Sequence, residues 1–363
     1  MYRLFFGPLL FLLLLIIKSP LFRGTRIDAS YGAMIMAIGI FSIGVFPQLH
    51  IPLVLPSYLI DAVLFFIWLF LIFSFMKAAL RGVFRKRYLT HPVQSFAVGT
   101  WVAATSILCL VLFHQFPFLQ PVIFTVALLN TGLWAFYMVL CLKSYKVILS
   151  AKYYTRIHGI VFLSTVSTQS LVILCNTLFQ TPFLQLLSRF VIAGGLFLYF
   201  LNLVLVIIRF QRFRRGDILD GWKNTNCIIH GAMSISGIAA IVSGAFTREV
   251  ILVMWIWAAL LFFIIESIEL WRMAARLQAY SLHEAIGRYH VSQWARNFTL
   301  GTFYMFTIHI DFTHAPAPFV MVQQLIVQSG IPVLILLLLA ECTLFFKDSL
   351  PWSESRDHVK QRA

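Results

Sequence analysis

The stretch Asn297–Phe303, N-F-T-L-G-T-F, opens the ninth long apolar segment of the chain and places a Phe three residues before a Gly. The same spacing recurs in Ser95–Trp101, S-F-A-V-G-T-W, at the third segment. A Phe-x-x-Gly-Thr-aromatic unit in two such segments indicates related helices around one axis. We therefore predict that these helices line a shared central passage and that Phe298 constricts it.

The composition is that of a membrane protein. Of the 363 residues, 60% are hydrophobic and 11% are charged, whereas about 25% of the residues of a soluble protein are charged. Apolar runs near the roughly 20 residues that cross a bilayer as a helix recur from end to end. The alternation of a transmembrane barrel strand is absent from the sequence. The chain is thus predicted to be an all-α transmembrane protein without a sizeable soluble domain.

The sequence divides into three parts. Residues 27–350 form the predicted transmembrane domain and residues 351–363 a cytoplasmic tail. In the N-terminal part, 1–26, the apolar run 4–17 is short for a span, so we expect an interfacial or re-entrant helix, with an extra span as the alternative. Ten spans are predicted, at 30–48, 54–76, 93–114, 121–143, 158–179, 187–209, 226–246, 249–271, 294–312 and 331–347.

The net charge of +15 is unevenly distributed among the loops. Loops after the even spans hold eighteen Lys and Arg, whereas the opposite loops hold only Arg189 and Arg248. Cytoplasmic loops of membrane proteins collect Lys and Arg, which explains this charge without a nucleic-acid partner. We expect a multi-pass protein of the plasma membrane, in contact with its lipids and with both termini cytoplasmic.

The spans pair into five hairpins that repeat in parallel. Tyr31-Gly-Ala-Met opens the first span and His230-Gly-Ala-Met the seventh. Odd spans are rich in Gly, Ser and Thr, whereas even spans are long runs of Leu, Ile, Phe and Trp. We predict an inner ring of odd helices within an outer ring of even ones; close helix packing is the alternative reason for the small residues.

Anions passing through such a ring need hydrogen-bond donors, and hydroxyls supply them without the fixed charge that would hold an anion tightly. Arg296, two residues before Phe298, either attracts anions or anchors the helix at the cytoplasmic side. His91, His158 and His230 open odd helices on that side, as a titratable ring or as ordinary interfacial residues. The predicted lining residues are Phe96, Gly99, Thr100, Ser164, Ser167, Ser234, Ser236, Gly301 and Thr302.

Acidic residues within the spans are costly and therefore informative. They are Asp61, Glu266, Glu269 and Glu341, all on even spans. Glu266 and Glu269 lie one turn apart. They either form salt bridges that join the two rings or carry protons in a coupled transporter.

Other chemistry is weakly supported. The sequence predicts neither a cofactor nor a metal site, because His309-x-Asp311-x-x-His314 lacks a fourth ligand. Ser234-Ile-Ser236-Gly237 lacks the first Gly of the G-x-S-G found in intramembrane serine proteases. We expect no enzyme; an intramembrane hydrolase using Ser236 is the least favoured alternative.

Three motifs resemble the tellurite-resistance/dicarboxylate transporter family, which includes the slow-type anion channels of plant guard cells and fungal malate and sulfite transporters. They are Tyr31–Ile40 (Y-G-A-M-I-M-A-I-G-I), His91–Trp101 (H-P-V-Q-S-F-A-V-G-T-W) and Trp294–Phe303 (W-A-R-N-F-T-L-G-T-F). The resemblance covers about residues 27–350.

The resemblance implies five hairpins in a quasi-fivefold array, a pore lined by odd helices, a plugging Phe on the ninth span, and trimers. Phe298 corresponds to that Phe through the Leu300-Gly301-Thr302-Phe303 that follows it. Members often have Pro after the Phe, where this chain has Thr299. The expected function is passage of small anions: C4-dicarboxylates, halide or nitrate, sulfite, or tellurite-related oxyanions. A proton-coupled dicarboxylate carrier of the same fold is the alternative.

Overall fold

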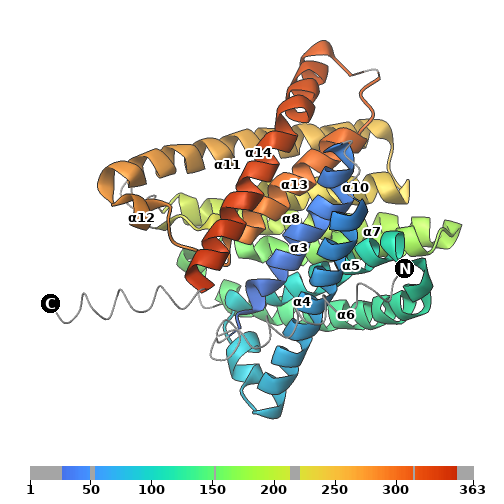
Figure 1. Ribbon diagram of the computed structural model, residues 1–363, viewed down its shortest axis with the longest axis horizontal. Coiled ribbons are helices and arrows are strands. Elements are labelled where there is room, and N and C mark those ends of the chain that lie inside the picture. Colours follow the sequence, from blue (N-terminus) through green and yellow to red (C-terminus); the bar gives the residue numbers. More distant parts are fainter. Residues whose placement is uncertain (1–26, 50–53, 151–152, 213–220, 314, 350–363) are drawn as a thin grey trace.

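The computed structural model describes residues 27–49, 54–150, 153–212, 221–313 and 315–349 (Figure 1). The predicted N-terminal segment 1–26 and tail 351–363 lie outside these residues. Within the described ranges the regular structure is helical and contains no strand. Nine helical segments there are long and apolar enough to cross a membrane, and the predicted ninth span is a further helix of 17 residues.

The odd spans are the shorter helices. They are α3 (Gly32–Ile40), α5 (Gly99–Gln115), α7 (Leu163–Leu178), α10 (Ile228–Ser243) and α13 (Gln293–His309). A π-helical turn, Phe41–Val45, continues α3. Four of the five follow a 3₁₀ turn at their N-terminal end, and all five begin on the side that carries the basic loops.

The even spans form the longer helices. They are α4 (Val54–Leu80), α6 (Gln120–Ser150), α8 (Pro182–Phe210), α11 (Arg248–Ala279) and α14 (Ala317–Ser349). The predicted start of the last span, residue 331, was wrong by more than three turns. Pro332 lies inside α14, and helices within membranes accommodate such a proline where neighbouring groups satisfy the freed backbone.

The five odd helices form a closed ring. Each contacts the next in chain order, and α13 returns to contact α3, so the first and last members lie side by side (Figure 1). In the spans that contain α3, α5, α7 and α10, 72–94% of the most apolar stretch is buried inside the protein. The corresponding share in the five even spans is 11–33%. The predicted inner and outer rings are therefore confirmed.

Glycines permit the closest contacts within the inner ring. A Cβ at Gly301 of α13 would approach the side chain of Ile40 in α3 to 2.7 Å, and one at Gly237 of α10 would overlap the Phe306 ring of α13. The packing explanation for small residues on odd helices is therefore correct at these positions.

Candidate anion passage and its mouth

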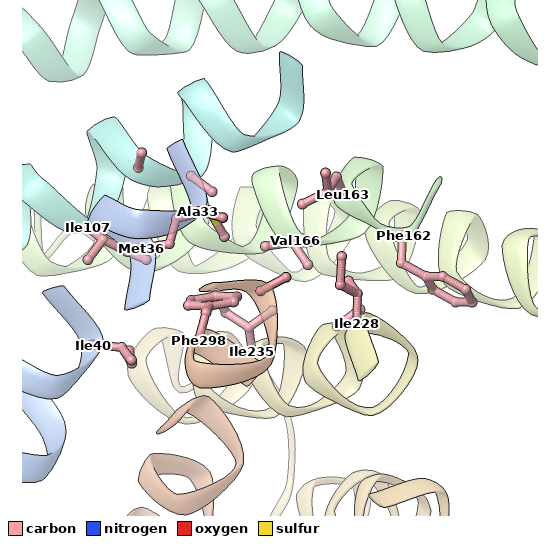
Figure 2. Packing of buried hydrophobic residues seen from close by; sticks show 14 of the residues in the cluster. Ala33, Met36, Ile40, Ile107, Phe162, Leu163, Val166, Ile228, Ile235 and Phe298 are labelled. Carbon is pink, nitrogen blue, oxygen red and sulfur yellow. The ribbon is translucent and has the colours of Figure 1, made fainter. Parts of the chain in front are cut away.

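Phe298 lies at the inside of the ring. Its side chain is 1% exposed, and α13, which carries it, packs against both α3 and α10. Figure 2 shows its ring among side chains from other inner helices, with Met36 and Ile40 of α3 on one side and Ile235 of α10 on the other. The ring is turned into the protein rather than toward lipid.

The helix around Phe298 is unbroken despite the Thr that follows it. Residues 293–309 form one α-helix. The Thr299 hydroxyl donates to the Arg296 carbonyl at 3.0 Å, and the Thr302 hydroxyl donates to the Phe298 carbonyl at 2.5 Å. Such back-bonding holds a Ser or Thr side chain against its own helix. Phe298 thus projects from a continuous helix.

Most of the predicted lining hydroxyls also donate to their own helix. Ser234 donates to the His230 carbonyl at 2.9 Å, Ser236 to that of Ala232 at 2.7 Å, and Ser167 to that of Ser164 at 3.2 Å. Each hydroxyl must leave its carbonyl, or share its proton, to bind an anion. Because the Ser236 hydroxyl donates to a backbone carbonyl of its own helix, it lacks, among the described residues, the contact with a general base that an activated nucleophile has.

Several other predicted lining residues face neighbouring helices. The Ser164 hydroxyl lies 3.1 Å from both Tyr145 of α6 and the amide nitrogen of Asn202 of α8. The Phe96 ring packs edge-on against Tyr145, at 5.0 Å between centroids. The Thr100 hydroxyl donates to the Ala29 carbonyl at 2.7 Å. Gly99 lies against the Tyr137 hydroxyl of α6. The structure places these side chains in contacts between helices.

A buried ion cluster joins α11 to α13 at the end that carries the basic loops. Glu269, 6% exposed, pairs with Arg296 at 2.6 Å and with Arg272 at 3.3 Å. The Trp222 indole donates to the same carboxylate at 2.7 Å. Glu269 therefore anchors the first turn of α13, and Arg296 is a partner in this cluster.

His230 joins α10 to α11, as Arg296 joins α13 to α11. Its Nε2 lies 3.6 Å from a carboxylate oxygen of Glu266 on α11, and its ring is fully buried against Phe262 and Phe303. Of the two explanations for Glu266 and Glu269, the geometry favours ion pairs that join the rings.

The three histidines occupy different environments. His91 is exposed and accepts from the Gln94 amide at 3.2 Å. His158, just before the span Gly159–Leu178, is hydrogen-bonded to the Thr225 hydroxyl at 2.8 Å. Desolvation, followed by the nearby charge of Arg209, lowers the pKa of His158 to about 3. His158 is therefore neutral at physiological pH, which disfavours one titratable ring of all three.

Two residues of the possible metal motif, His309 and Asp311, lie at the end of α13 away from the basic loops and are not brought together by the described structure. The His309 ring is hydrogen-bonded to the Met305 carbonyl, Asp311 pairs with Arg248 at 3.3 Å, and His314 lies outside the described residues. The described ranges contain no cluster of three or more His, Cys, Asp or Glu positioned to hold a metal ion.

Sequence reasoning missed two polar partners. Asn202 is a lone amide in an apolar run of α8, and that isolation was its signal; its amide donates to the Val161 carbonyl at 3.1 Å. The partner of Asp61 was also missed: the Ser42 hydroxyl, in the π-helical turn after α3, donates to that carboxylate at 2.5 Å. No local pattern connects these two residues.

Five short helices form a closed ring inside five longer and less buried helices, and the aromatic ring of Phe298 is turned inward. The model of the family described as voltage-dependent anion channel matches residues 26–344, most of the chain. The chain belongs to this family, which confirms the resemblance seen in its motifs. It is therefore a multi-pass membrane protein of a family that moves anions across membranes. A comparison with curated proteins gives no match.

Proposed function

We propose that the protein lets small anions cross the plasma membrane along the axis of the inner ring and that Phe298 closes this passage. The observation that carries the proposal is the fully buried ring of Phe298, turned inward from α13 among side chains of α3 and α10. An apolar ring in a narrow passage blocks ions because it excludes the water that would hydrate them.

The candidate substrates are C4-dicarboxylates, halides or nitrate, sulfite and tellurite-related oxyanions. Ser167, Ser234, Ser236 and Thr302 are the hydroxyls proposed to meet the anion, and weak sites of this kind favour passage over capture. Arg296 is neutralised by Glu269 at 2.6 Å, so attraction of anions falls mainly to the excess basic residues of the loops. The basic side is proposed to be cytoplasmic and the assembly a homotrimer.

The test is anion flux into liposomes that contain purified protein. Phe298→Ala is expected to raise the flux well above that of the wild type. Phe303→Ala is the matched control, because Phe303 is also buried on α13 but stacks on Phe262 of α11, at 4.6 Å between centroids. Equal flux in Phe298→Ala and the wild type would refute the gate, and equal gains in both variants would indicate loosened packing instead.

The proton-coupled carrier remains the alternative of the same fold. Glu266 and Glu269 already face His230, Arg296 and Arg272, and removal of their charge should weaken the packing of the rings more than it alters coupling. Uptake that ignores a pH gradient and survives Glu→Gln at both positions would eliminate this alternative.

A further inference from the structure

Asp61 is a buried carboxyl group that has no positively charged partner among the residues that the structure describes. It lies on α4, its side chain is fully buried, and one oxygen accepts the Ser42 hydroxyl at 2.5 Å. The other oxygen, Oδ2, makes no hydrogen bond to any described residue. Glu266 and Glu269, by contrast, face Arg or His side chains.

Within the described ranges, the groups that face Asp61 from neighbouring elements are neutral. They are the Ser42 hydroxyl, from the π-helical turn after α3, and the Gln115 side chain, from the end of α5. His114, next to Gln115, is exposed. An ionised carboxylate buried in a membrane protein without a countercharge is strongly disfavoured, whereas a carboxylic acid is tolerated. Its proton would occupy the unpartnered Oδ2.

Ser42 donates its hydroxyl proton to a carboxylate. Ser106, Ser234 and Ser236 donate to carbonyls of their own helix, whereas Ser42 donates to Asp61 of the outer ring. Ser42 lies in a π-helical turn, a distortion often found at functional sites.

The same π-helical turn packs against the helix that carries Phe298. A Cβ at Gly44 would meet the Met305 sulfur at 3.1 Å, and one at Gly301 would meet the Phe41 ring at 3.4 Å. Gly301 lies one helical turn after Phe298. The turn therefore lies between Asp61, which accepts from its Ser42, and α13, which carries Phe298.

We propose that Asp61 is a proton-binding site that controls the constriction at Phe298. With its proton, Asp61 holds α4 against the π-helical turn and the passage stays closed. When the proton leaves to water near Gln115, the carboxylate requires solvation, α4 separates from the turn, and α13 is released. This inference rests on the proposed function, because it regulates the same constriction.

The test compares flux at equal pH on both sides of the membrane, from about pH 5 to about pH 9, a range that covers buried carboxyl groups. Wild-type flux should rise with pH by up to about tenfold per unit, the limit for one titrating proton. Asp61→Asn should remain at the low-pH flux throughout. Glu341→Gln, at a buried carboxyl on α14, is the matched control and should keep the pH response.

Two further measurements separate this inference from the proposed gate. Infrared difference spectroscopy should show a carboxylic acid signal that titrates with pH; the part of this signal due to Asp61 should be lost in Asp61→Asn and kept in Glu341→Gln, whether or not the protein conducts. Phe298→Ala should restore flux in the Asp61→Asn protein. A pH response that survives Asp61→Asn would overturn the proposal, as would a flux response to Na⁺ at constant pH that Asp61→Asn abolishes.

Discussion

Replacement of Glu269 by Gln tests how strongly the buried ion cluster holds the two rings together. The carboxylate of Glu269 meets Arg296 at 2.6 Å, Arg272 at 3.3 Å and the Trp222 indole at 2.7 Å. Gln keeps the shape of the side chain and an oxygen that can accept from the indole. It removes the negative charge that compensates both guanidinium groups.

The expected cost follows from the burial of the cluster. Removal of one partner from a buried ion pair typically destabilises a protein by about 3–5 kcal/mol, because the remaining charge is left uncompensated. Glu269 is 6% exposed and the Arg272 side chain 13%, whereas Arg296 is 29% exposed and can recover some solvation. We therefore expect a loss of about 3 kcal/mol, at the lower end of this range.

Denaturant unfolding of the detergent-solubilised protein measures this loss. Glu284→Gln is the matched control, since Glu284 pairs with Arg288 at 3.7 Å while their side chains are 49% and 68% exposed. An exposed pair contributes about 0–1 kcal/mol. Similar losses in the two variants would refute the reasoning, because burial would then make no difference.

The remaining predictions concern packing and pH. Gly237→Ala should destabilise the protein by about 1–3 kcal/mol, because the Cβ of the new alanine overlaps the Phe306 ring. At Gly132 a Cβ meets no described atom within 4 Å. Gly132→Ala should therefore be neutral or stabilising by up to about 1 kcal/mol in the same denaturant titration. His158 has a pKa lowered to about 3 when folded, against about 6.5 when unfolded, so the unfolded chain takes up its proton first and stability falls as pH drops below about 6.5. His158→Asn should flatten this part of the stability–pH curve, and an unchanged slope would contradict the shift.

The sequence was sufficient for the rings but not for the side chains that face the passage. Periodic apolar runs and the basic loops predict hairpins, because the bilayer imposes both length and charge placement. The direction in which a hydroxyl points depends on which neighbouring group forms a hydrogen bond with it. Ser164 meets Asn202 and Tyr145, and Ser42 meets Asp61, through contacts between segments distant in the chain.

Phe298 and Glu269 illustrate the same distinction. The Phe-x-x-Gly spacing located Phe298 on an inner helix, because small residues mark the side where helices approach closely. For Glu269, sequence spacing favoured a salt bridge but left a proton carrier as the alternative. The choice required the positions of Arg296 and Trp222, which come from two other parts of the chain.

The contact between α3 and α13 has a consequence for biosynthesis. The ring is completed only where Gly301 meets Ile40, one near each end of the chain. Until the ribosome has delivered the last hairpin, the earlier hairpins form an open arc that encloses nothing. An unfinished chain therefore has no closed ring, and the side of α3 that packs against α13 lacks that neighbour until the last hairpin is inserted.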